Sequence, residues 1–117
     1  METFVNFSNH PSDKWSSEQM RAANEYGRVV DMQFPEVNPE LSEEDIKVLA
    51  DEYTASILLY EPAAVMCQGE FTLCYAVIER LKAENIPVVA ACSQRNVVEL
   101  SEGVKTAVFD FVRFREY

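Results

Sequence analysis

The sequence predicts an α/β fold of three layers, with a central, mostly parallel sheet and a C-terminal antiparallel hairpin. Two apolar stretches, residues 63–67 and 88–92, lack a polar face, which is typical of strands covered by helices on both sides. Stretches with helical spacing separate the expected strands, so that strand and helix alternate as β-α-β-α-β-α-β. This alternation predicts a single Rossmann-like domain over residues 1–117.

The first half of the alternation has clear start and stop signals. Residues 4–7 and 28–32 are the first two expected strands. Between them, Ser16 followed by Gln19 has the spacing of a capping box, which predicts that a helix begins there. Gly27 is a typical residue to end that helix.

The next two helices differ in how they begin. Ser42 and Asp45 form a second capping box, and apolar residues recur at helical spacing up to Tyr60, before Pro62 ends the helix. The third helix begins at Gly69, with no Ser, Thr, Asp or Asn immediately before it, and closes at residues 85–87. Its expected inner stripe consists of Phe71, Cys74, Tyr75, Ile78 and Leu81.

The last quarter of the chain predicts a hairpin at the sheet edge. Residues 97–100 and 104–114 are the expected strands, with a turn at 101–103. A strand as apolar as "VFDFVRF" is prone to recruit another chain when its edge is bare. We therefore expect a homodimer formed through this hairpin.

The charge restricts the class of partner. The chain carries 20 Asp and Glu against 10 Lys and Arg, for a net charge of −10. This acidity opposes binding to long nucleic acids, whose affinity depends on cationic side chains. A small anionic ligand is still compatible, because a few aligned amides and one or two cations can hold it.

The cysteines and the apolar pattern predict a location in the cytoplasm. Cys67, Cys74 and Cys92 lie in apolar context without CxxC spacing, so we expect free, buried thiols in a reducing compartment. No charged-then-apolar leader follows Met1, and no apolar run approaches the roughly 20 residues that span a bilayer. We expect no membrane partner.

The expected strand order 2-1-3-4 places a crevice between the first and third strands, where neighbouring connections leave in opposite directions. Loops 8–15 and 68–72 meet there. Because the third helix has no obvious cap, its first amides, Gly69 and the Thr72 hydroxyl predict an anion site. Two alternatives stay open: a glycine that serves only a tight turn, and a Glu70 carboxylate that itself occupies the helix end.

His10 also has two interpretations. It is the only histidine in the chain, and with Lys14 nearby it can move a proton or stabilise an oxyanion. A histidine before proline is equally a structural loop residue. Trp15 is expected to be a hydrophobic staple or an edge-of-core residue rather than a base-stacking platform.

The rim that follows the fourth strand completes the candidate site. Arg95 is the best candidate there to meet a phosphate, with a solvated loop arginine as the alternative. The chain has no GxGxxG, P-loop or GxSxG motif and no histidine cluster, so we expect no metal and no cofactor. The expected catalytic residues are His10 and Lys14. The expected ligand-binding residues are Ser8, Asn9, Ser12, Gln68, Gly69, Glu70, Thr72, Ser93 and Arg95.

In these motifs the chain resembles the small CRISPR-associated CARF-like proteins, including the ring nucleases that act on cyclic oligoadenylate messengers. The resemblance rests on "NFSNHPS" and "SSEQ" after the opening strand, on "CQGEFT" after the third strand, and on the order of elements. It implies a homodimer that binds the messenger across its two-fold axis. It also implies a metal-free reaction in which a ribose 2′-OH attacks its own phosphodiester.

The roles that the resemblance implies fall on matching positions of this chain. His10 would supply acid/base or oxyanion help, and Lys14 and Arg95 would contact phosphate. Gly69 and Thr72 would contribute backbone and hydroxyl contacts. The leading hypothesis is thus a protein that binds and cleaves cyclic oligoadenylate, and the alternatives are a non-catalytic module that senses or sequesters a nucleotide, or a dimeric interaction protein.

Overall fold

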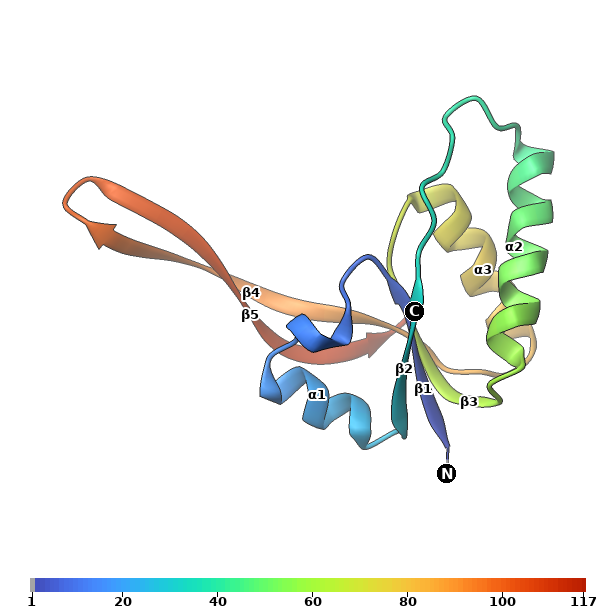
Figure 1. Ribbon diagram of the computed structural model, residues 1–117, viewed down its shortest axis with the longest axis horizontal. Coiled ribbons are helices and arrows are strands. Elements are labelled where there is room, and N and C mark those ends of the chain that lie inside the picture. Colours follow the sequence, from blue (N-terminus) through green and yellow to red (C-terminus); the bar gives the residue numbers. More distant parts are fainter. Residues whose placement is uncertain (1) are drawn as a thin grey trace.

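A computed structural model describes residues 2–117 of the chain (Figure 1). The β-α-β-α-β-α-β order and the final hairpin are confirmed. A short 3-10 helix, Ser12–Lys14, precedes the first α-helix. The strands are β1 (Thr3–Ser8), β2 (Arg28–Gln33), β3 (Pro62–Cys67), β4 (Val88–Ser101) and β5 (Val104–Glu116), and the helices are α1 (Ser17–Asn24), α2 (Glu43–Leu58) and α3 (Phe71–Ala83).

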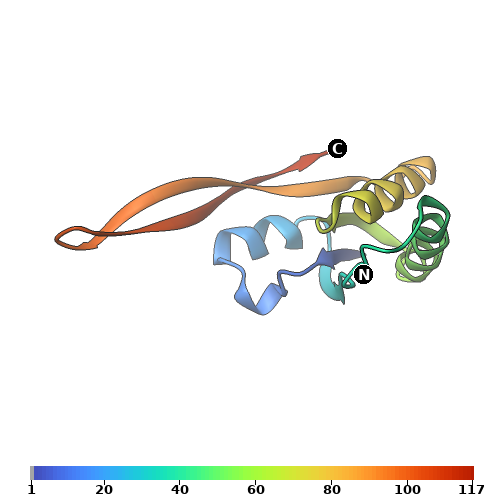
Figure 2. The ribbon, with the colours of Figure 1, turned by 90° about the horizontal axis from the view of Figure 1, so that it is seen from above.

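The five strands form one mixed sheet in the order β2-β1-β3-β4-β5. The pairs β1–β2, β1–β3 and β3–β4 are parallel, and β5 lies antiparallel to β4. The predicted strand order is therefore confirmed. Helix α1 lies apart from α2 and α3, which pack together (Figure 2). The sheet thus changes its direction of winding between β1 and β3.

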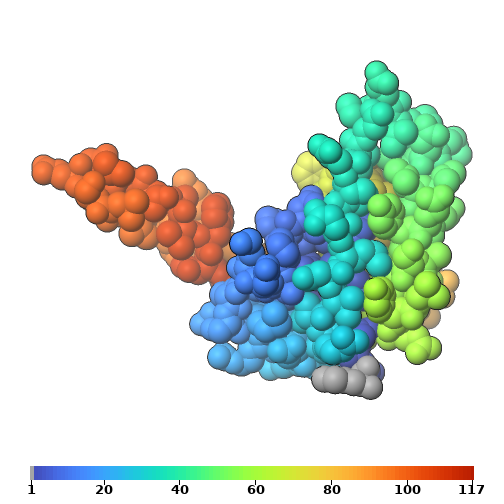
Figure 3. Space-filling view, in the orientation of Figure 1, coloured from blue at the N-terminus to red at the C-terminus, as the bar shows by residue number. Residues whose placement is uncertain are grey.

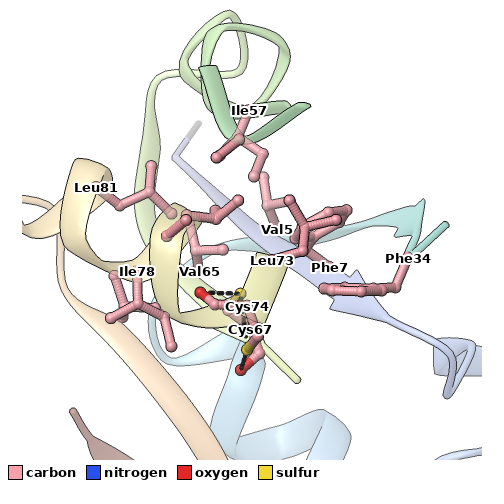
Figure 4. Packing of buried hydrophobic residues seen from close by; sticks show 14 of the residues in the cluster. Val5, Phe7, Phe34, Ile57, Val65, Cys67, Leu73, Cys74, Ile78 and Leu81 are labelled. Atoms are coloured by element: carbon pink, nitrogen blue, oxygen red, sulfur yellow. Dashed lines mark hydrogen bonds between the residues drawn. The ribbon is translucent and has the colours of Figure 1, made fainter. Parts of the chain in front are cut away.

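Residues of β1 alternate between two apolar cores, as expected for a strand covered on both faces. Val5 and Phe7 pack with residues of α2 and α3, while Phe4 packs with Ala23 of α1 and with Phe114 of β5. Figure 4 shows the first of these cores, in which β1 and β3 supply one wall and α3 another.

The helix starts agree with the sequence for α1 and α2. The Ser16 hydroxyl accepts from the Gln19 amide, and Ser42 and Asp45 form the complete capping box. The end of α2 is different from the expectation. The helix stops at Leu58, Tyr60 lies exposed beyond it, and Pro62 is the first residue of β3, which the fixed backbone of proline tolerates.

The predicted inner stripe of α3 is wrong at two positions. Phe71 and Tyr75 are exposed, with 89 % of the Phe71 surface accessible. Leu73 and Val77 are buried instead, next to Cys74, Ile78 and Leu81. This helix is apolar on most of its circumference, so spacing alone does not identify the side that faces the sheet.

The strand β4 is much longer than predicted. It continues without a break through residues 93–96, which the sequence suggested as a loop, and pairs with β5 as far as Ser101. A register shift lies between Cys92 and Ser93. From the Ser93–Phe111 pair outward, the two strands leave the body as a hairpin arm, residues 93–111, with Gly103 at positive φ in its turn (Figure 3).

Candidate functional site

A cleft opens because β4 diverges from β3. The two strands pair only at Val65–Val88 and Met66–Val89, after which β4 continues with β5 alone. Just beyond the end of β3, the Gln68 side-chain oxygen accepts a 2.6 Å hydrogen bond from the Ala91 amide. This side chain bridges the two diverging strands where a regular sheet would have a backbone bond.

The cleft lies at the carboxyl ends of β1 and β3, the switch point at which ligands bind in open α/β sheets. We call it the switch-point cleft. Its larger chamber has a volume of about 640 Å³ and its smaller chamber about 360 Å³, and the two share Asn9, His10 and Gln68. Small-molecule sites occupy the same size range, roughly 300–1,000 Å³.

The first-strand loop is fixed by hydrogen bonds to one carbonyl group. The His10 carbonyl oxygen accepts from the Asn6 amide at 2.8 Å and from the Trp15 indole at 3.0 Å. Asn6 and Ser8 are buried. The backbone at His10 is therefore fixed, and its side chain is presented to both chambers.

Two of the predicted binding residues of this loop have structural partners instead. The Ser8 hydroxyl donates to the Asn6 side chain at 2.6 Å and accepts from the His10 amide. Ser12 binds the Asp31 carboxylate through its amide and hydroxyl, which ties the loop to β2. Neither residue lines the cleft, whereas Lys14 lines the larger chamber.

The expectation that α3 starts without an internal cap is wrong. The Glu70 carboxylate accepts from the Thr72 amide at 2.7 Å, from the Leu73 amide at 3.2 Å and from the Thr72 hydroxyl. Burial alone would raise the pKa of Glu70, but these hydrogen bonds outweigh it and lower the pKa. The donors expected to bind an external anion are therefore occupied by a side chain of the same molecule.

Gly69 is exposed in the smaller chamber on one side and packed on the other. A Cβ atom at this position would lie 2.6 Å from the ring of Phe34, which is buried. Gly69 is therefore a glycine that close packing at the turn requires, and it also lines the cleft. Thr72 turns away from the cleft and lines a separate hollow between α2 and α3.

The two predicted binding residues of β4, Ser93 and Arg95, lie in different places. Ser93 lies at the base of the arm and lines the larger chamber. Arg95 lies farther out, opposite Phe109 on β5, and is exposed outside both chambers. The expected loop, which could have folded over the cleft, is absent: residues 93–96 are held extended by pairing with residues 108–111.

The aromatic walls of the cleft were not predicted as a set. Phe109 and Phe111 of β5 line the larger chamber beside Trp15. Trp15 also packs against Phe4 and Phe114, as expected for an edge-of-core residue. No sequence signal identifies Phe109 or Phe111, because their place in the cleft depends on where the hairpin joins the body.

The charge of the cleft differs from that of the chain. Asp and Glu make up 20 of the 117 residues, yet no Asp or Glu side chain of residues 2–117 lines either chamber. Lys14 is the charged side chain of the lining, accompanied by His10 and several amide and hydroxyl groups. The same described range has no group of three or more His, Cys, Asp or Glu arranged to hold a metal ion.

The fold is an α/β fold with a cleft at the switch point of a mostly parallel sheet. A family model matches residues 2–115, and the chain belongs to the uncharacterized protein MJ1673 family. A search of curated proteins finds no match. Among residues 2–117, no helix combines the length and apolar character needed to cross a membrane.

Proposed function

We propose that this protein binds a small anionic nucleotide of the cyclic oligoadenylate class in the switch-point cleft. The observation that carries the proposal is the composition of the cleft: its lining includes Lys14 and His10 but no Asp or Glu, in a chain that has 20 of these acidic residues. An anion binds best where cations and polar N–H or O–H groups surround it and where no carboxylate repels it. The resemblance of "NFSNHPS" and "CQGEFT" to CARF-like proteins supports this nucleotide class.

Each part of such a ligand has a complementary group in the cleft. Phe109 and Phe111 provide aromatic surface for adenine bases, and base stacking on such rings is worth about 1–3 kcal/mol per base. Asn9 and Gln68 offer side-chain amides to base or ribose. Lys14 offers the charge for a phosphate. Arg95 and the α3 amides are not part of the proposed site.

The binding test uses titration calorimetry with cyclic tetra-adenylate and cyclic hexa-adenylate. Lys14→Ala should weaken binding about ten-fold or more, because it removes a charged hydrogen-bond donor. Lys47→Ala is the matched control, since Lys47 lies on α2 and pairs with Glu44. The proposal would be overturned if the folded protein bound neither cyclic nucleotide, or if Lys14→Ala and Lys47→Ala lost affinity equally.

Ring opening is a second candidate function, favoured by the presence of His10 and Lys14 in one chamber. The ribose 2′-oxygen would attack the adjacent phosphorus while the bond to the 5′-oxygen breaks, which gives a 2′,3′-cyclic phosphate and a 5′-hydroxyl. His10 would take the 2′-OH proton or supply one to the leaving oxygen. Lys14 would stabilise the added negative charge.

Incubation with the same nucleotides in EDTA, followed by chromatography, separates cleavage from binding. His10→Ala should slow the appearance of linear product while it leaves affinity mostly unchanged. Intact ligand recovered from a protein that binds it would assign the chain to the non-catalytic class, which senses or sequesters the nucleotide.

The same proposal includes a homodimer formed through the hairpin arm. Val97, Leu100 and Val104 are at least half exposed along the arm, and an isolated two-stranded hairpin is marginally stable in water. Light scattering at micromolar concentration should give the mass of a dimer. Leu100→Ser with Val108→Ser should give a monomer, whereas Val48→Ser on α2 should not. A dimer that binds no nucleotide would favour the interaction-protein alternative.

The proposal also places the protein in the cytoplasm and excludes long nucleic acids as its partners. Cys67, Cys74 and Cys92 are free thiols, the state typical of reducing compartments, although Cys92 is half-buried rather than buried as expected. The net charge of −10 opposes nonspecific binding to a nucleic-acid backbone.

A further inference from the structure

A pair of thiols lies directly beneath the smaller chamber of the cleft. The sulfur atoms of Cys67, at the end of β3, and Cys74, in the first turns of α3, are 3.5 Å apart (Figure 4). The Cys74 thiol also donates to the Cys67 carbonyl oxygen at 3.4 Å. The two residues are seven positions apart, so the fold rather than a local motif brings them together.

The two thiols differ in access to small molecules. Cys67 is fully buried, whereas Cys74 lines the smaller chamber with Gly69 and Tyr117. The Tyr117 hydroxyl donates to the same Cys67 carbonyl at 2.7 Å and borders this opening. A small oxidant that enters the chamber therefore meets Cys74 first, with Cys67 directly behind it.

The electrostatic surroundings favour Cys74 as the reacting thiol. A hydrogen bond from Cys67, followed by one from the Gly69 amide, lowers the pKa of Cys74 against the opposing effects of burial and of the nearby Glu70 carboxylate. The hydrogen bond with Cys74 and burial raise the pKa of Cys67. Burial, and then the neighbouring thiols, raise the pKa of Tyr117.

We propose that Cys67 and Cys74 are a modification site at which a peroxide converts two thiols into an intramolecular disulfide. The Cys74 thiolate attacks one oxygen of hydrogen peroxide, the O–O bond breaks, and hydroxide leaves, which makes a sulfenic acid. The Cys67 sulfur then attacks the Cys74 sulfur and displaces hydroxide, which leaves as water with the Cys67 proton. In total the dithiol loses two electrons and two protons, and peroxide becomes two waters.

The disulfide would close a loop from residue 67 to residue 74. This loop holds Gln68, Gly69 and Phe71 of the cleft lining, so the modification fixes the floor of the cleft. Intracellular disulfides of this kind are typically transient and redox-sensing. Formation of the bond is independent of the proposed nucleotide, so that it can be tested without one.

The test is mass spectrometry of the Cys92→Ser protein after treatment with hydrogen peroxide in slight excess. We expect the loss of two hydrogen masses, resistance of both thiols to alkylation, a linked 67–74 peptide, and full reversal by dithiothreitol. Cys67→Ser with Cys92→Ser should instead accumulate a sulfenic acid at Cys74 that a dimedone probe captures. Cys74→Ser with Cys92→Ser should not react on the same timescale.

The wild-type chain provides a measurement that does not depend on the folding of these variants. Peptide mapping after oxidation should show the Cys67–Cys74 link with Cys92 still free. Full alkylation of Cys67 and Cys74 after peroxide treatment, oxidation of Cys74 to sulfinic acid with Cys67 reduced, or a predominant disulfide that includes Cys92 would overturn the proposal.

Discussion

The side-chain amide of Asn6 donates a 2.8 Å hydrogen bond to the carbonyl oxygen of His10. The same nitrogen donates to the Asp31 carboxylate at 2.9 Å, and the Asn6 oxygen accepts from Ser8. One buried side chain thus joins β1, β2 and the loop that carries His10. It links polar groups of all three segments at the carboxyl end of β1.

Replacement of Asn6 by Ala should reduce the free energy of unfolding by about 2–3 kcal/mol, because it removes three hydrogen bonds of a buried side chain, one of them with the buried Ser8 hydroxyl. Urea titration followed by the fluorescence of Trp15, the single tryptophan, measures this change. Asn9→Ala is the control, since Asn9 is exposed and bonds only Gln33; it should stay within about 0.5 kcal/mol of wild type. Equal effects of the two variants would contradict the role given to Asn6.

Gly69→Ala should destabilise the protein by about 1–3 kcal/mol, because the new methyl group overlaps the buried ring of Phe34. The ring has little freedom to move, since it packs against Phe7 with ring centroids 4.7 Å apart. Thermal unfolding of the single variant and of Gly69→Ala with Phe34→Leu measures the clash. The second change should offset part of the loss from the first, and strictly additive losses would argue against steric overlap.

Glu70→Ala should cost about 1 kcal/mol at neutral pH, since it removes the cap of α3. The folded-state pKa of Glu70 lies below its ordinary value of 4.5, so this contribution is present above that value and is lost as the pH falls through the lowered pKa. Unfolding free energies of wild type and variant should therefore converge in acid. Glu79→Ala, on the exposed side of α3, removes a carboxylate without removing a cap. A Glu70→Ala deficit that is constant with pH would contradict this account.

Thr54→Val should be neutral or stabilising by up to about 1.5 kcal/mol. The Thr54 hydroxyl is buried in α2 and has no hydrogen-bond partner within the described part of the chain. An isosteric methyl group removes the cost of this unpaired oxygen. Thr3→Val is the matched comparison, because the buried Thr3 hydroxyl donates to the Tyr60 carbonyl at 2.9 Å. Chemical denaturation should show a loss for Thr3→Val alone, and a comparable loss for Thr54→Val would refute the prediction.

The order of strands and the positions of helices α1 and α2 could be predicted from the sequence because their signals are local. Ser16 and Ser42 are caps with short-range partners, and the apolar strands 63–67 and 88–92 are unambiguous. The Glu70 cap of α3 is predicted only as an alternative to an open anion site, for a physical reason. Glutamate is an unusual N-cap residue, but the longer side chain of Glu70 folds back to reach the amides of Thr72 and Leu73.

The parts that sequence analysis missed depend on contacts between distant segments. Residues 93–96 are polar and have no strand signal of their own, yet pairing with residues 108–111 keeps them extended. Phe109 and Phe111 reach the cleft only because of that pairing. Arg95 is exposed and does not line the cleft, although its partner Phe109 does, so the cations of the site could not be chosen from sequence position alone.

Because Phe109 and Phe111 belong to β5 and also form one wall of the larger chamber, a displacement of the arm changes the width of the opening. If the protein forms a dimer and binds a ligand in the cleft, the two equilibria are coupled. The factor by which bound ligand changes the affinity between two copies equals the factor by which dimer formation changes the affinity for the ligand. The apparent affinity for such a ligand would therefore vary with protein concentration.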